Sequence, residues 1–325
     1  AKYTRFQGGG SSHTRPQILP SFIDILNKNK VKYRYFECFN DKDNVDDVLA
    51  LNSIRDQKVL VFLGLFENEE SEGRDRNSLE LSPSQLALME HLQNYKNVGV
   101  ILELGSVVSL PFINNIKGLL IPYLGGCAVN DALFNIVYGY VNPSGKLSES
   151  WINKLSDNPS SLKYDTDPYN AFYQEDIYVG YRYYQKNDIN VTLPFGFGLS
   201  YSNFELSNPK AKLKKKNILL KVDVTNTSNI FGKCVIQCYS HNNSTNLYST
   251  LKDLCAFRKV ALKPNESKTV KILIDLDSLK KYSTSLNKNI LEDGDYTIYI
   301  GQSSMDLLLS IVLHISGEKV EKEEF

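Results

Sequence analysis

A ten-residue stretch of this chain, from Glu67 to Arg76, contains five carboxylates and two guanidinium groups. It directly follows an apolar run at residues 59–66, which predicts a buried β-strand. Because ligands of open α/β sheets bind just beyond the carboxyl ends of the strands, this loop is well placed for chemistry. A carboxyl group crowded by others can have its pKa raised enough to donate a proton near neutral pH. The alternative interpretation is an ordinary solvated run of charges.

Length and charge limit the classes of protein to which the chain can belong. Its 325 residues are enough for about two domains, each with its own hydrophobic core. The 37 basic and 37 acidic residues balance, so we expect neither a nucleic acid nor a membrane surface as a partner. The longest apolar runs are much shorter than the roughly 20 residues that a membrane-spanning helix needs.

The cysteine and histidine residues indicate neither a disulfide framework nor a metal site. The five cysteines include no Cys-x-x-Cys pair, which favours reduced thiols and a cytoplasmic location. The four histidines lack the spacing of zinc ligands, and we expect no metal and no other cofactor. The chain starts at Ala1 without an initiator methionine or a signal segment, so we expect that an upstream part has been removed.

Residues 1–150 alternate helix and strand signals, which predicts an α/β sandwich with a mostly parallel sheet flanked by helices. One helix start is clear, because Ser82 can act as the N-cap and Pro83 suits the first turn. The predicted helices are 22–26, 45–54, 82–95 and 126–138, and the predicted strands are 31–36, 59–66, 98–102 and 118–122.

From about residue 206 the pattern changes to short strand-like runs separated by polar turns. This regular spacing predicts an all-β sandwich, which we place at residues 206–318. Because the Cys…Trp…Cys pattern of antibody domains is absent, a fibronectin type III-like sandwich fits better. The predicted strands are 218–224, 234–239, 255–262, 269–274, 296–300 and 307–314.

Residues 151–205 form a connection that is rich in tyrosine and lacks clean periodicity. A connection of this length inside a compact protein is usually functional or packed against another part. The tyrosines at 178–184 carry a large aromatic area with little nearby sequence to bury it. We therefore expect this segment to pack against a domain that is missing from the chain.

Four segments, taken together and in order, are far more specific than any one of them. They are RFQGGGSSH at 5–13, ESEGRDR at 70–76, NPSGKL at 142–147, and VGYRYY at 179–184 running on to LPFGFGLSY at 193–201. Together they closely resemble the C-terminal portion of family 3 glycoside hydrolases of the bacterial β-glucosidase type. The resemblance covers almost the whole chain.

The resemblance implies a longer enzyme built from three parts. An N-terminal TIM-like barrel carries a nucleophilic aspartate, an α/β sandwich domain supplies the acid/base carboxylate, and a fibronectin type III-like domain often closes the chain. Residues 1–150 correspond to the α/β sandwich domain, while the barrel and its nucleophile are missing. We therefore expect the chain to be inactive by itself.

Carried over residue by residue, the resemblance makes Glu72 the acid/base candidate, with Glu70 the next candidate. A retaining glycosidase needs a second carboxylate, about 5–5.5 Å from the first, to attack the anomeric carbon. We expect burial and nearby negative charge to raise the pKa of Glu72, which should face a sugar cleft whose other wall is the absent barrel. The residues that we expect to bind substrate are Ser12, His13, Glu70, Asp75 and Arg76.

The glycine-rich run at 8–13 has more than one interpretation. A phosphate-binding loop is disfavoured because no P-loop Lys-Ser/Thr follows, and an expression linker is disfavoured by the sequence after His13. The resemblance makes the run an interface loop beside the sugar pocket. His13 then either contacts substrate or is satisfied by local hydrogen bonds.

The resemblance implies that the whole protein hydrolyses terminal β-glucosides or short oligosaccharides with retention of configuration. Two alternatives stay open: a non-catalytic scaffold or carbohydrate-binding module derived from such an enzyme, and a related β-xylosidase or N-acetylglucosaminidase. Relatives commonly carry an acidic residue in the segment matched by 122–127, and this chain has none there.

Overall fold

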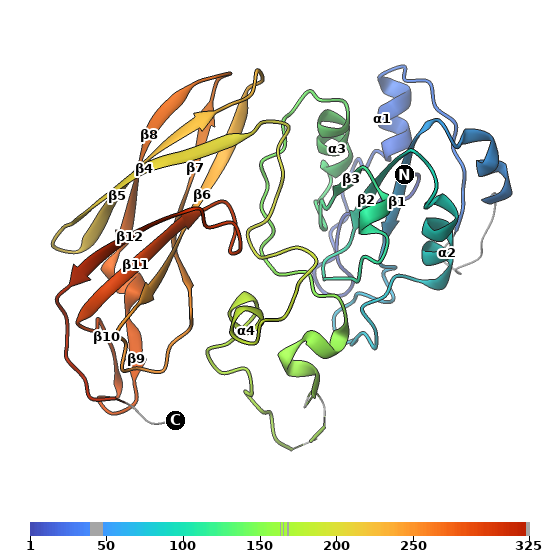
Figure 1. Cartoon of the computed structure of the whole chain (residues 1–325). Coiled ribbons are helices and arrows are strands. Elements are labelled where there is room, and N and C mark those ends of the chain that lie inside the picture. The colour runs from blue at the N-terminus through green and yellow to red at the C-terminus, as the bar shows by residue number, and fades with distance from the viewer. Residues whose placement is uncertain (40–47, 163, 165, 168, 323–325) are drawn as a thin grey trace. The chain divides into compact units, whose positions relative to one another are not determined.

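The computed structural model describes residues 1–39, 48–162, 164, 166–167 and 169–322. The chain divides into two compact units, the first formed by residues 1–141 and 152–155 and the second by residues 142–151 and 156–325. Their helices and strands are shown in Figure 1. Within the described residues, every helix is too short or too polar to span a bilayer.

The first unit contains a parallel sheet with the strand order β1 (Lys58–Gly64), β2 (Asn97–Glu103) and β3 (Gly118–Leu120). Phe62, Ile101 and Leu120 lie side by side on one face, and α1 (Phe22–Lys28) and α3 (Val129–Val137) pack against them (Figure 1). This arrangement, together with the second unit, confirms the predicted fold class.

The other face of this sheet is also apolar, because successive side chains of a strand point to opposite faces. Val61, Val100 and Leu102 point that way and are buried. The remaining α-helix of this unit, α2 (Pro83–Leu92), is fixed to the end of β1 by Gln85. The side chain of Gln85 bonds both the N–H and the C=O of Gly64. Pro83 opens this helix as predicted.

Two predictions for the first unit need correction. Residues 31–36 form no strand among the described residues, because Lys32 and Arg34 interrupt the two-sided apolar pattern that a covered parallel sheet requires. The predicted helix 45–54 lies partly outside the described residues, and its described part is a 3-10 helix, Val48–Ile54. A second 3-10 turn, Ile113–Asn115, precedes β3.

The second unit contains a β-sandwich whose strands are all antiparallel. One sheet has the order β12 (Leu309–Ile315), β11 (Gly294–Gly301), β6 (Gly232–Asn242) and β7 (Asp253–Leu262). The other has the order β4 (Phe204–Leu213), β5 (Asn217–Asn226) and β8 (Ser267–Asp275). A small hairpin of β9 (Lys281–Ser283) and β10 (Lys288–Ile290) follows the 3-10 turn Leu276–Leu279.

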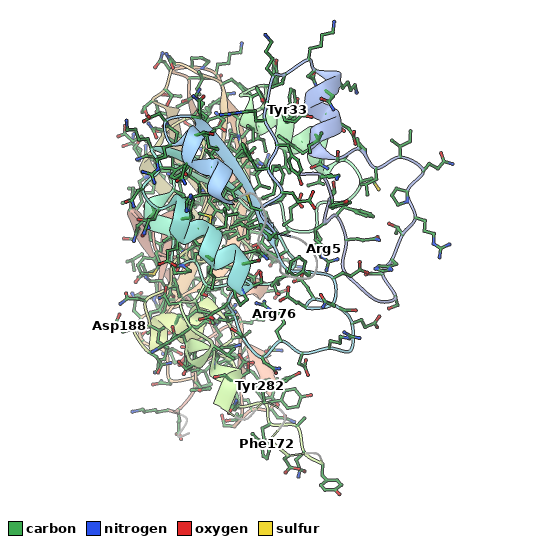
Figure 2. The ribbon with its side chains drawn as sticks, turned by 90° about the vertical axis from the view of Figure 1, so that its right-hand side faces the viewer. Arg5, Tyr33, Arg76, Phe172, Asp188 and Tyr282 are labelled. Carbon is green, nitrogen blue, oxygen red and sulfur yellow. The ribbon has the colours of Figure 1, made fainter. Side chains whose placement is uncertain are left out.

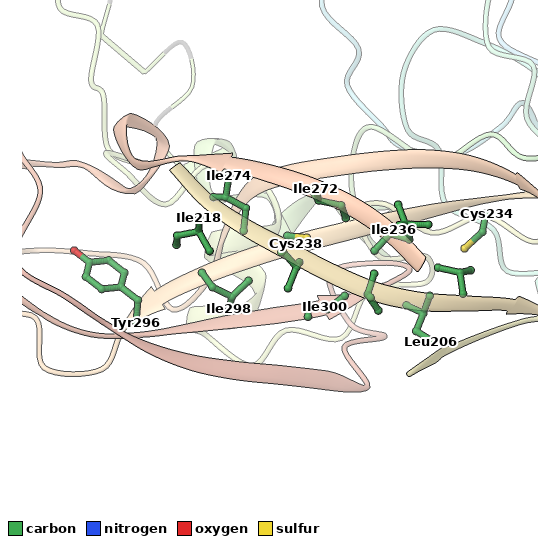
Figure 3. Close-up of a cluster of buried hydrophobic side chains, with 14 of the residues drawn as sticks. Leu206, Ile218, Cys234, Ile236, Cys238, Ile272, Ile274, Tyr296, Ile298 and Ile300 are labelled. Carbon is green, nitrogen blue, oxygen red and sulfur yellow. The ribbon is translucent and has the colours of Figure 1, made fainter. Parts of the chain in front are cut away.

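The sandwich core is formed by the alternate residues of these strands that point inward. Figure 3 shows isoleucines of β5, β6, β8 and β11 meeting between the sheets. Ile218, Ile236, Ile274 and Ile298 are fully buried there. β4 and the short hairpin were not predicted, since β4 contains Pro209 and two lysines that weaken its strand signal.

The tyrosine-rich connection packs partly on this sandwich, which corrects the expectation of a missing partner for all of it. Tyr181, at the start of α4 (Tyr181–Lys186), stacks on Phe195 with ring centroids 4.7 Å apart. Its hydroxyl accepts a hydrogen bond from Leu254 N–H, and Tyr178 donates to the carbonyl of Ser249. Two 3-10 turns, Leu155–Asp157 and Pro159–Leu162, lie upstream.

Candidate active site

The carboxyl ends of β1 and β2 lead into the two loops of the candidate site, at residues 65–76 and 104–107. Because the strands are parallel neighbours, both loops leave the same edge of the sheet. The glycine-rich segment lies against the first loop, where Gly9 forms a parallel bridge with Ser71. The Gly9 N–H also donates to the carbonyl of Glu70 at 3.4 Å. Three segments distant in sequence therefore meet here.

Glu72, the predicted acid/base residue, has an exposed side chain. Its Oε2 atom accepts a hydrogen bond from the Ser11 N–H at 2.8 Å and a second from the Ser11 hydroxyl. Both bonds stabilise the ionised carboxylate and lower the pKa of Glu72, and burial opposes them only weakly. The expected rise in this pKa is therefore wrong for the chain by itself.

Glu70 has a different environment from Glu72, because its side chain is only 14 % exposed. Its carboxylate accepts hydrogen bonds from the Gly105 N–H, at 2.8 and 2.9 Å to the two oxygens, and from the Ser106 hydroxyl at 2.8 Å. The guanidinium of Arg5 lies 3.8 Å from the same carboxylate. Glu70 thus ties the loop after β1 to the loop after β2.

Replacing Glu70 with Ala is expected to destabilise this edge of the first unit by about 2 kcal/mol, because charge-assisted hydrogen bonds to Gly105 and Ser106 are lost. The change should appear as faster amide hydrogen exchange in residues 98–107 of the chain. Glu80→Ala is the matched control, since Glu80 is exposed. Unchanged exchange in Glu70→Ala would show that the carboxylate does not hold the two loops together.

The other predicted substrate-binding residues lie around these loops. His13 Nε2 is 2.6 Å from Glu67 Oε1, so His13 closes the glycine-rich segment onto the loop after β1. Ser12 and Asp75 are both exposed. Contacts of these side chains with substrate stay a prediction.

Two arginines brace the loops, and both are labelled in Figure 2. Arg5 donates from Nη2 to the carbonyl of Glu70 at 3.0 Å and from Nη1 to the carbonyl of Gln7 at 2.6 Å. Arg76 donates from Nη1 to the Ser106 hydroxyl at 3.0 Å and to the Val107 carbonyl at 2.9 Å. Arg76 is therefore directed at the loop after β2.

Three residues that build the site had no assigned role at the sequence level. Ser11 and Arg5 lie in the RFQGGGSSH segment at 5–13. Their hydrogen-bond partners are 61 and 65 residues away, so the spacing of residues in the sequence does not predict either contact. Glu103 ends β2 and is 5 % exposed, and burial raises its pKa. Its Oε2 accepts a hydrogen bond from the Arg5 N–H at 3.2 Å. This bond holds the backbone of the N-terminal segment at the end of β2.

The arrangement can supply Glu72 as an oriented, solvent-accessible carboxyl group for proton transfer. Within the described residues, no group of three His, Cys, Asp or Glu side chains is placed to hold a metal ion. A depression of about 460 Å³ lies elsewhere on the first unit, lined by Ile18, Pro20, Asp24, Ile25, Lys28, Cys127, Ala128 and Asp131. None of its lining residues belongs to the loops that carry Glu72.

Comparisons with known proteins agree with this architecture. Residues 1–181 match the family model described as glycosyl hydrolase family 3 C-terminal domain, and residues 234–304 match the fibronectin type III-like domain. The crystal structure of a family 3 β-glucosidase from Bifidobacterium adolescentis superposes on this chain with a TM-score of 0.90 and 34% sequence identity. The match covers 97% of this chain and 48% of that chain.

Two curated relatives are about equally similar to this chain in sequence but are named for different sugars. Thermostable β-glucosidase B of Acetivibrio thermocellus is 34% identical over 100% of this chain and 45% of its own length. The exo-α-(1→6)-L-arabinopyranosidase of Bifidobacterium breve is 35% identical over 98% of this chain and 43% of its own length. The chain thus spans less than half the length of either relative.

Proposed function

We propose that this chain, which belongs to glycosyl hydrolase family 3 and is the C-terminal portion of such an enzyme, supplies the proton donor of a retaining β-glucosidase. Glu72 is the donor, and the nucleophilic carboxylate lies on an N-terminal barrel of the whole protein. The substrate is a terminal β-glucoside or a short oligosaccharide.

One observation carries the choice of Glu72: its carboxyl group is exposed yet held by Ser11 at the carboxyl edge of the parallel sheet. A proton donor must reach the glycosidic oxygen, so it needs both access and a fixed orientation. Glu70, the other candidate, is mostly buried and bonded to Gly105 and Ser106. Glu70 therefore serves as an anchor and leaves Glu72 as the acid.

The low pKa of Glu72 in this chain is compatible with an acid role only if another part of the enzyme raises it. A barrel wall over Glu72 would do this in two ways, because burial penalises the ionised form and a nearby nucleophilic carboxylate repels its charge. The same wall would complete the sugar cleft. In this proposal the proton-donating state of Glu72 is created by domain assembly.

The domain organisation that goes with this function has three parts. In this proposal residues 1–150 belong to the α/β sandwich domain that carries Glu72, although residues 142–150 pack with the second compact unit. Residues 151–205 form the connection, and residues 206–318 form the fibronectin type III-like domain. The contacts of Tyr178 and Tyr181 with Ser249, Leu254 and Phe195 support assigning the connection a structural role.

The proposed function is tested by following the product anomer with proton NMR while the whole protein hydrolyses a 4-nitrophenyl β-glucoside. We expect β-glucose as the first product, since two successive displacements restore the starting configuration. Initial release of α-glucose would overturn the retaining mechanism. No hydrolysis of any aryl glycoside would favour the scaffold or binding-module alternative.

The same assay with an aryl α-L-arabinopyranoside tests the second candidate substrate. A relative named for that sugar is as similar to this chain as one named for glucose, so the described half of the protein does not separate them. The proposed proton donor has the same task in both, because the leaving oxygen must be protonated whichever sugar is cleaved. A preference for the arabinopyranoside would change the substrate and leave the role of Glu72 intact.

A further inference from the structure

The hydrogen bonds that the described part of the chain donates to the Glu72 carboxylate all go to one of its two oxygens. Both the Ser11 N–H and the Ser11 hydroxyl donate to Oε2. Oε1 accepts no hydrogen bond from the described residues. Oε2 is therefore held by Ser11, and Oε1 is left available for another hydrogen bond.

This contact is built into the backbone of the glycine-rich segment. Gly10 has a φ of +90°, and a Cβ atom placed on it would lie 2.5 Å from Glu72 Cβ and 2.8 Å from Oε2. Only glycine tolerates both that backbone conformation and that approach. The bridge between Gly9 and Ser71 fixes the register, so the two donors of Ser11 arrive beside the carboxylate. The backbone around Ser11 therefore holds this serine in place beside Glu72.

We propose that Ser11 is a positioning residue that holds Oε2 of Glu72, so that Oε1 carries the proton delivered to the leaving oxygen. This inference rests on the proposed function of Glu72 as the acid/base residue. A carboxyl proton sits on the oxygen that is not already accepting hydrogen bonds. Ser11 thus decides which oxygen is the acid.

The proton accounting in both steps follows from this assignment. In the first step the nucleophilic carboxylate bonds to the anomeric carbon, the glycosidic C–O bond breaks, and its electron pair takes the proton from Oε1. Glu72 becomes a carboxylate whose charge on Oε2 is stabilised by the two Ser11 donors. In the second step Oε1 takes a proton from water as the water oxygen replaces the enzyme ester at the anomeric carbon.

Ser11 is also the dominant local influence on the acidity of Glu72. The Ser11 hydroxyl and N–H bonds are the largest causes of its lowered pKa, ahead of the opposing effect of burial. Of the nearby charged groups, His13 pairs with Glu67, Arg5 bonds the backbone of Glu70 and Arg76 bonds Ser106, and no charged group is among the causes of the lowered pKa of Glu72. Removing the hydroxyl should therefore raise the pKa of Glu72.

The first test is a carboxyl ¹³C NMR titration of Glu72 in the 325-residue chain. In Ser11→Ala the Glu72 midpoint should rise by roughly one pH unit, whereas Ser11→Thr, which keeps both donors, should leave it unchanged. Thr14→Ala is the matched control, because the Thr14 hydroxyl donates to Gln7. An unmoved midpoint in Ser11→Ala, or an equal rise in Thr14→Ala, would overturn the inference.

The second test uses the whole protein and separates this inference from the proposed function. The basic limb of kcat/KM for an alkyl β-glucoside reports the acid in the free enzyme, and it should move up by roughly one pH unit in Ser11→Ala. We expect kcat to fall about 10-fold with KM nearly unchanged, because binding contacts stay in place. If Glu72→Gln impairs alkyl glucosides selectively but the Ser11→Ala limb does not move, only the role of Ser11 fails. If Glu72→Gln lacks that selectivity, the proposed function itself fails.

Discussion

Glu72→Gln in the whole protein is expected to slow hydrolysis of a methyl β-glucoside by about 10²–10⁴-fold, the usual contribution of a positioned general acid. An aryl glucoside with a good leaving group should be slowed far less in the first chemical step, because its leaving oxygen needs no proton. Gln keeps an oxygen that can accept the Ser11 hydrogen bonds, so the loop geometry should persist. The measurement is kcat/KM across a series of leaving groups.

The control for this series is Glu80→Gln, which removes an exposed carboxyl group from the same region of the sequence. It should leave kcat/KM unchanged for every leaving group. Equal losses for alkyl and aryl substrates in Glu72→Gln would mean that Glu72 contributes to binding or folding and not to proton donation.

The isolated 325-residue chain is expected to show no detectable turnover of even the most reactive aryl β-glucoside. The retaining mechanism requires a nucleophilic carboxylate to form the glycosyl–enzyme bond, and a good leaving group cannot replace that carboxylate. The assay compares the chain with the whole protein at equal molar concentration. Mixing the chain with a separately produced N-terminal half should restore turnover if the two parts associate.

Clear turnover by the isolated chain would contradict this expectation, provided that Glu72→Gln slows it by removing the base of the second step. That result would place both carboxyl groups on the 325-residue chain. Two carboxylates close in sequence to Glu72 have other tasks, since Glu70 bonds Gly105 and Glu69 accepts a hydrogen bond from Phe66 N–H at 2.7 Å.

Much of the fold was predictable from local patterns. The strands β1 and β2 are continuous apolar runs, and α2 opens with Pro83 where the sequence placed a helix start. The segment 31–36 was wrongly predicted as a strand because aromatic residues there have high strand propensity, while its charges exclude it from a sheet covered on both faces. Propensity is local, whereas coverage of a sheet is a tertiary property.

The candidate site was predictable only in part, because its residues are joined by contacts between distant segments. The order of the motifs gave Glu72 its proposed role, and the structure adds that Ser11 holds it. The distinct environments of Glu70 and Glu72 depend on the loop after β2, which lies more than 30 residues away in sequence. The lowered pKa of Glu72 follows from hydrogen bonds that no spacing rule describes.

The tyrosine-rich connection shows the same limit. Its aromatic area correctly indicated packing, but the sequence could not tell which surface covers it. Tyr181 and Tyr178 find partners some 70 residues downstream on the β-sandwich. Tyr169 and Tyr173, in contrast, are each 92 % exposed.

The most direct measurement of the central claim is the azide reaction of Glu72→Ala in the whole protein with an aryl β-glucoside. The glycosyl–enzyme should still form, but water attacks it slowly without a base at position 72. Azide needs no base, so it should accelerate turnover by displacing the enzyme carboxylate from the anomeric carbon, giving β-glucosyl azide. Absence of acceleration, or formation of α-glucosyl azide, would contradict the assignment of Glu72 as the acid/base residue.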